Sequence, residues 1–153
     1  MTRYAEGTTV TSAKSKAEIE ATLGRYGADQ FIYGWMEDQA VVGFRMHERQ
    51  IKFVLPLPGV ADFTETPTGR ARSIDAQRTE YEKATRQRWR ALALVIKAKL
   101  EAVESGITEF DDEFMAHIVL PSGETVGSWM KPQIAIAYDS GDMPPLLPAP
   151  RGR

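Results

Sequence analysis

The sequence predicts an α+β fold, in which a three-stranded antiparallel meander packs on one long helix and a small helix and hairpin layer follows. Two observations predict it. Short segments with two-residue alternation follow one another over residues 30–55, as half-buried strands do. Apolar residues then recur at three- and four-residue steps over 74–105, the period of a helix with one buried side. The length of 153 residues is that of one domain, which can bury about 70% of its unfolded surface.

The overall composition is ordinary for a globular protein and excludes several classes. Hydrophobic residues make up 42% and charged residues 26%, and the net charge is -2, which excludes a histone-like basic tail and a strongly acidic mimic. No apolar run of about 18 residues exists, and the first ten residues lack a signal-peptide pattern. Because there is no cysteine, disulfides and thiolate chemistry are excluded, and we expect a cytoplasmic protein without membrane association.

We expect residues 1–11 to be a loose lead-in and a helix to follow over about 15–26. Ser15 and Glu18 have the spacing of a capping box. Gly27 is a typical stop. The apolar side of this helix would consist of Ile19, Leu23 and Tyr26.

Three strands are predicted next, at Gln30–Met36, Ala40–Met46 and Gln50–Leu55. Their short connections predict an antiparallel meander. One face of this sheet must be buried against another element. Tyr33 and Trp35 share a face, so either both pack in the core or both are exposed, where bases could stack on them.

The segment 56–73 contains three prolines and two glycines, and we expect a flexible loop within the domain. A long helix should then run from about Ile74 to Ser105 and end at Gly106. The segment Ala91–Ile96 is apolar nearly all round, which predicts that this part is covered on more than one side. The predicted buried stripe is Tyr81, Trp89, Leu92, Ile96, Leu100 and Val103.

The last third predicts shorter elements. We expect a brief helix that begins near Thr108, a hairpin over 118–126, and a final helix that Ser128 caps and Gly141 ends. The single domain would span 1–142. The segment 143–153 holds four prolines and should form an extended tail, which is either a disordered end or a docking segment for an aromatic groove.

The small net charge conceals a strong asymmetry along the chain. From Arg70 to Lys99 there are nine basic and three acidic residues, a net charge of +6. From Leu100 to Met130 there are seven acidic residues and no Lys or Arg, a net charge of -7. Such an asymmetry indicates charged partners.

Four cations of the long helix would form a row on one side. At 100° per residue they lie within about 60° of one another and span about 20 Å, which suits a phosphate backbone. The alternative is a solvated helix face with local pairs to Glu80 or Glu82. The predicted nucleic-acid contacts are Lys83, Arg86, Arg90 and Lys97 on the helix, Arg70 and Arg72 in the loop, and Arg45 and Lys52 on the sheet.

Enzymatic chemistry has less support. On a continuous helix, Glu109, Glu113 and His117 would line one side at four-residue spacing and could hold Mg²⁺ or Mn²⁺. Acidic residues in a first helical turn are also what the helix dipole favours. No phosphate-binding loop, nucleophile elbow or dinucleotide fingerprint is present. We therefore expect no metal, no cofactor and a protein that is not an enzyme, with a metal-dependent nuclease as a lesser alternative.

A short helix, three strands, a loop and a long basic helix in this order resemble the single-strand annealing proteins of phage recombination. The resemblance covers about residues 15–105 and includes the basic segment Glu82–Arg90. It implies a β-β-β-α unit lining a basic groove in a ring or filament. The segments Ala98–Gly106 and Leu120–Gly127 are also similar to uncharacterised small proteins of phage and mobile elements.

These observations favour a non-enzymatic nucleic-acid-binding protein, of which a single-strand binder or annealer is the specific form. The competing hypothesis is a protein–protein interaction module or homo-oligomer, in which the +6 and -7 segments pair between subunits.

Overall fold

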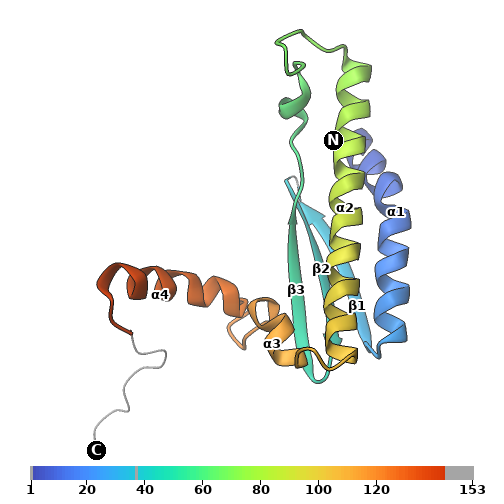
Figure 1. Cartoon of the computed structure of the whole chain (residues 1–153). Coiled ribbons are helices and arrows are strands. Elements are labelled where there is room, and N and C mark those ends of the chain that lie inside the picture. The colour runs from blue at the N-terminus through green and yellow to red at the C-terminus, as the bar shows by residue number, and fades with distance from the viewer. Residues whose placement is uncertain (1, 37, 144–153) are drawn as a thin grey trace, which may run out of the picture.

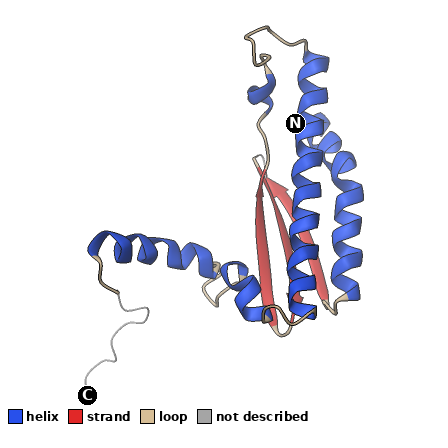
Figure 2. Cartoon of the chain, viewed as in Figure 1, coloured by secondary structure: helices blue, strands red, loops and turns tan. Residues whose placement is uncertain are grey.

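The computed structural model describes residues 2–36 and 38–143, with side chains described from Ser12 on. A three-stranded antiparallel sheet carries two long helices on one face, and shorter helices follow beside and beyond it (Figures 1 and 2). This confirms the predicted α+β class. In chain order the elements are α1 (Thr2–Arg25), β1 (Gln30–Met36), β2 (Gln39–Met46), β3 (Arg49–Pro56), the 3₁₀ helix η1 (Val60–Phe63), α2 (Ile74–Glu104), α3 (Phe110–Phe114), the 3₁₀ helix η2 (Met115–His117) and α4 (Val126–Ser140).

The sheet is the predicted meander, with strand order β1-β2-β3 and strand bounds within one residue of those expected. Phe31 lies opposite Phe44 and Val42 opposite Phe53, so these side chains share the face that the helices cover. The turn between β2 and β3 is the pair His47–Glu48, and both residues have positive φ, 51° and 61°. Positive φ at both central positions is the geometry of a type I′ hairpin turn.

The core lies between the sheet and α2. Alternate residues of β2 and β3 face the helix, namely Ala40, Val42, Phe44, Met46, Ile51, Phe53 and Leu55. The buried stripe of α2 is Tyr81, Thr85, Trp89, Leu92, Ile96 and Leu100. The predicted stripe is therefore confirmed at five of its positions. Val103 is only half-buried, and Thr85 had not been expected.

The long helix α2 is not covered all round. Ser73 caps it, because its hydroxyl accepts a hydrogen bond of 3.1 Å from the amide of Ala76. The expectation that Ala91–Ile96 is covered on more than one side is confirmed, because the sheet and α1 both pack against this part of α2, but Leu94 is still 63% exposed and Val95 44% exposed. Leu94 lies about 170° around the helix from the middle of the buried stripe, which is the side of α2 farthest from the sheet.

The first helix is longer than expected. It begins at Thr2 and not near Ser15, so the predicted loose lead-in and capping box are both wrong. Ser15 and Lys16 are buried in the middle of α1, where they continue the stripe that Ile19 and Leu23 form further along. A search for apolar periodicity overlooks a buried stripe whose first half is polar.

The connection between β3 and α2 rises above the sheet beside the first turns of α2 (Figure 1). We call residues 57–80 the arm. Phe63 of η1 packs edge-on against Tyr81 at a centroid distance of 6.5 Å, and Glu65 forms a β-bridge with Ala71. The expected loop therefore contains local secondary structure.

The C-terminal segments begin beside the sheet and end away from it (Figure 1). Phe114 of α3 is buried and packs edge-on against Phe44 and Phe53. The expected hairpin is a tight turn in which Val119 pairs with Thr125. In α4 no side chain is buried.

The caps of α4 differ in part from the prediction. Thr125 and not Ser128 is the N-cap, because the Thr125 hydroxyl accepts from the Ser128 amide. Gly141 ends the helix with a φ of 75°, as predicted. Of the expected proline-rich tail, residues 144–153 lie outside the described residues.

Glu48→Gly should raise the free energy of unfolding by about 0.5–1 kcal/mol. A left-handed backbone costs an L-residue about 1–2 kcal/mol, and glycine removes that cost while adding entropy to the unfolded chain. Thermal and urea unfolding would measure the change. Glu48→Ala is the control, because alanine keeps the strain and should bring no gain. Equal stabilities of the glycine and alanine variants would contradict a strained turn.

Candidate nucleic-acid interface

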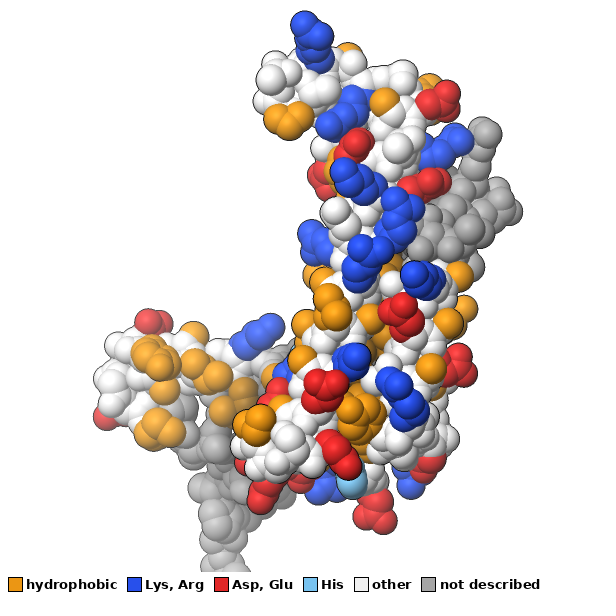
Figure 3. All heavy atoms as spheres, turned by 45° about the vertical axis from the view of Figure 1, so that its right-hand side comes forward, with side chains coloured by type: hydrophobic (Ala, Val, Ile, Leu, Met, Phe, Trp, Pro, Cys, Tyr) orange, Lys and Arg blue, Asp and Glu red, His pale blue; other side chains and the backbone are white. Residues whose placement is uncertain are grey.

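The four cations predicted to form a row on α2 are all exposed and lie on one side of the helix. Lys83, Arg86, Arg90 and Lys97 are spaced by three, four and seven residues and lie about 120° from the buried stripe. We call these four residues the basic face. In the space-filling view, Lys and Arg side chains gather over the upper half of α2 and the arm, whereas Asp and Glu side chains predominate near the lower end (Figure 3).

No carboxylate among the described side chains forms an ion pair with the basic face. Within residues 12–36 and 38–143, the ion pairs closer than 4 Å join Arg45 to Asp29, Arg49 to Asp111 and Lys99 to Glu113. Glu80 and Glu82, the expected local partners, pair with none of the four cations. These cations are therefore available to an anionic partner.

A groove between α1 and α2 extends the basic face toward α1. Its volume is about 480 Å³, and Arg90 and Lys97 line it together with Arg25 and Glu18 of α1. Arg25 was missed at the level of sequence because it looked like an ordinary cation in a last helical turn. Its proximity to Arg90 depends on the packing of α1 along α2.

The two arginines predicted from the loop differ in their surroundings. Arg70 is exposed on the arm. Arg72 is part of the arm's own structure, because its guanidinium donates to the carbonyl of Glu65 at 2.8 Å and to that of Phe63 at 3.4 Å. Arg70 is thus free to contact a ligand, while one nitrogen of Arg72 already has internal partners.

Arg45 and Lys52, the predicted contacts on the sheet, lie apart from the basic face. Both alternate with core residues of β2 and β3, so they project from the face of the sheet opposite α2. Arg45 also pairs with Asp29 at 3.7 Å. The structure brings the α2 cations together but does not join Arg45 and Lys52 to them.

Tyr33 and Trp35 lie on the helix-covered face of β1, and each is about half exposed. The ammonium group of Lys16 lies 4.2 Å from the centre of the Tyr33 ring and 5.2 Å from that of Trp89. These are cation–π contacts. Burial lowers the pKa of Lys16 below its usual 10.5. Sequence reasoning missed this lysine because it expected a cap at that point of α1.

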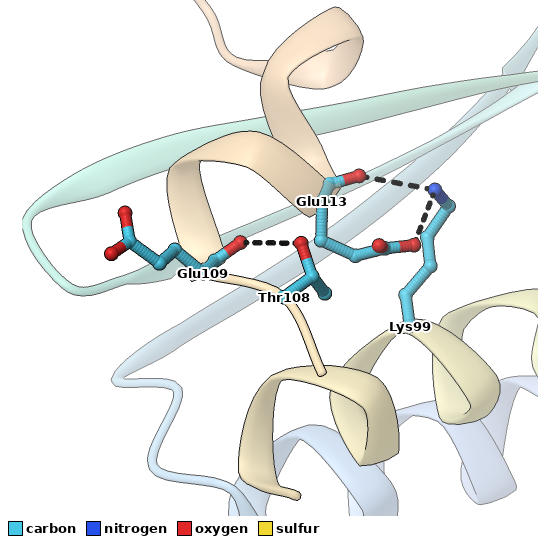
Figure 4. A network of polar contacts seen from close by, with 4 residues as sticks. All are labelled: Lys99, Thr108, Glu109 and Glu113. Atoms are coloured by element: carbon cyan, nitrogen blue, oxygen red, sulfur yellow. Dashed lines mark hydrogen bonds and ion pairs between the residues drawn. The ribbon is translucent and has the colours of Figure 1, made fainter. Parts of the chain in front are cut away.

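The acidic residues of α3 form contacts with the body of the protein. Lys99 donates to the side chain of Glu113 at 3.2 Å and to its backbone carbonyl at 3.1 Å, while the side chain of Glu109 lies apart (Figure 4). The four-residue row considered as an alternative metal site does not form, because the α-helix ends at Phe114. Among the described residues, no group of three or more His, Asp or Glu side chains is placed to hold a metal ion.

His117 connects η2 to the core. Its ring stacks on Phe53 with a centroid distance of 4.0 Å. Burial and then the nearby Lys99 charge lower the pKa of His117 below its usual 6.5, and a backbone hydrogen bond with Lys52 opposes them. The folded protein therefore favours the neutral ring.

Acidification should destabilise the fold through His117. Because the pKa is lower in the folded state, the unfolded chain binds more protons below its own value of about 6.5. The stabilisation is complete above about pH 6.5 and is lost as pH falls toward the folded pKa. Urea unfolding at pH 7.5 and 5.5 would measure this loss. His117→Phe keeps a stacked ring and should lose less stability on acidification than the wild type. If His117→Phe lost as much stability on acidification as the wild type does, this account would be contradicted.

None of the helices that the structure describes combines the length and apolar character required to cross a membrane.

Comparisons with protein-family models, with curated proteins and with solved structures found no match to this chain. The geometry of the surface is therefore the basis for the functional proposal.

Proposed function

We propose that the protein binds nucleic acid in the cytoplasm, and that the basic face of α2 contacts the phosphate backbone. The supporting observation is a row of four exposed cations without ion-pair partners among the described residues. Lys83 and Lys97 are 14 residues apart, which corresponds to about 21 Å along a straight helix. Arg25 and Arg70 add positive charge beside and above this row.

The form of nucleic acid that we propose is single-stranded DNA, with annealing of complementary strands as the activity. The support is the likeness of the β-β-β-α order to phage annealing proteins, together with half-exposed Tyr33 and Trp35 at the first strand. Bases of a single strand stack on exposed aromatic rings. This finer proposal predicts tighter binding to single strands than to duplexes and faster strand pairing in the presence of the protein.

Salt dependence should reveal the number of phosphate contacts. Four contacts to a single strand give a slope of about -2.8 in log affinity against log salt, so affinity should fall about 50-fold between 50 and 200 mM. Removal of Arg86 and Arg90 leaves two contacts of the row, and the fall should then be about 7-fold. Fluorescence anisotropy of labelled single-stranded and duplex oligonucleotides would measure both.

The matched control is a variant with the same change in net charge at positions outside the basic face. Arg49→Ala with Lys131→Ala also removes two exposed cations and should keep the roughly 50-fold fall expected for four contacts. No binding at 50 mM salt by the wild type would contradict nucleic-acid binding. Equal salt slopes for the wild type and Arg86→Ala with Arg90→Ala would place the contacts elsewhere.

A second candidate function is assembly through opposite charges. The observation that favours it is the separation of a basic upper half from an acidic lower end (Figure 3). In this case the basic face of one copy would contact Glu101, Glu104 or Asp112 of another. Self-association that weakens with salt, is lost in Arg86→Ala with Arg90→Ala, and occurs without nucleic-acid binding would identify this function.

A further inference from the structure

The helix α4 has an uncovered apolar side. Ile134 is 47% exposed, Ile136 55% and Tyr138 87%. At 100° per residue the apolar residues occupy a little more than half of the helix circumference, while Lys131 and Asp139 lie on the other side. The residues of the apolar side are Val126, Trp129, Met130, Ile134, Ile136, Ala137 and Tyr138. A helix with this pattern buries its apolar side in a stable protein.

The direction of α4 is determined at its first turn. A Cβ atom on Gly127 would lie 2.9 Å from the carbonyl oxygen of Ala116, so only glycine permits this close approach of α4 to η2. The amide of Val126 also donates to the carbonyl of Ile118 at 2.9 Å. From this joint α4 runs away from the sheet (Figure 1), and it therefore does not reach the sheet of its own chain.

The outer face of the sheet, opposite α2, is the complementary uncovered surface. Ile32 is 69% exposed and Val54 46%. A shallow groove of about 240 Å³ crosses this face, with Ile32, Val41 and Val119 among its lining residues. Gly43 leaves space for the side chain of Ile32 beside this groove, because a Cβ atom at position 43 would lie 3.0 Å from Cγ1 of Ile32.

The two surfaces match in length and in charge. The 15 residues of α4 span about 22 Å, and strands of 7–8 residues span about 25 Å. The C-terminal end of α4 has the negative end of the helix dipole, and Asp142 follows directly after the C-cap Gly141. The outer face carries Lys52 and Arg45 beside its apolar residues. Cations on the sheet thus match the acidic end of the helix.

We propose that α4 docks on the outer sheet face of a second copy of this chain, and that two copies exchange their α4 helices reciprocally. Each contact buries an apolar helix side and an apolar sheet face that one copy leaves exposed. The basic face of α2 lies on the opposite side of the sheet and stays open. The proposal does not depend on nucleic-acid binding.

Light scattering after gel filtration would test it across protein concentrations of about 1–100 µM, the range in which weak dimers dissociate. The wild type should have twice the chain mass of 17.1 kDa. Ile134→Ser with Ile136→Ser alters the helix, and Ile32→Thr with Val54→Thr alters the sheet; each pair should weaken dimerisation at least tenfold. Lys131→Ser with Ala135→Ser, on the other side of α4, should still dimerise. Circular dichroism would check that each variant folds.

Mixing the two weakened variants distinguishes exchange from other arrangements. The sheet variant still has an intact α4, and the helix variant still has an intact outer sheet face. A mixed dimer should therefore form, in which α4 of the sheet variant docks on the sheet of the helix variant. A monomeric wild type would overturn the proposal. A dimer that the sheet variant leaves unchanged would also overturn it, because α4 would then pack on something else.

Crosslinking tests the contact in nearly unaltered protein. The chain contains no cysteine, so Val54→Cys with Ile136→Cys places the only two thiols on the proposed surfaces. A short bismaleimide should join two chains. A link within one chain would show that α4 covers its own sheet and would overturn the exchange.

Discussion

The packing of α2 on one face of the meander determines the rest of the structure. Trp89, Ile96 and Leu100 lie in the core against the inner residues of β2 and β3. Each such side chain contributes about 1.5–3 kcal/mol when buried. The helices cover only one face of the three-stranded sheet, so the outer face of the sheet remains exposed. The side of α2 that points away from the sheet remains exposed as well.

The two exposed surfaces carry different chemistry. The far side of α2 bears cations that no described carboxylate neutralises, which favours an extended polyanion as partner. The outer sheet face is apolar at its centre, and it matches the uncovered side of α4 in length. The core lies between these surfaces, so an interaction at one leaves the other accessible. Lys16 is an exception, since it lies inside the helix–sheet interface against Tyr33 and Trp89.

Much of the fold was predictable because its signals are local. Alternation between apolar and polar residues identified the three strands, and the three- and four-residue spacing from Tyr81 to Leu100 identified α2. The first half of α1 was missed because the buried stripe of this helix contains polar residues, Ser15 and Lys16, at the point where the apolar pattern stops. Within the candidate site, helical spacing predicted the basic face. The separation of Lys52 from it, and the proximity of Arg25, depend on how elements pack, which spacing does not encode.

Lysine-reactivity footprinting by mass spectrometry tests the central claim most directly, because it reports on both surfaces in unmodified protein. A single-stranded oligonucleotide at low salt should protect Lys83 and Lys97 from acetylation by at least several-fold. Lys131 on α4 and Lys52 on the outer sheet face should react at the same rate with and without it. Protection of Lys52 in place of Lys83 and Lys97, or no protection of any lysine, would contradict the assignment of the basic face of α2 as the nucleic-acid surface.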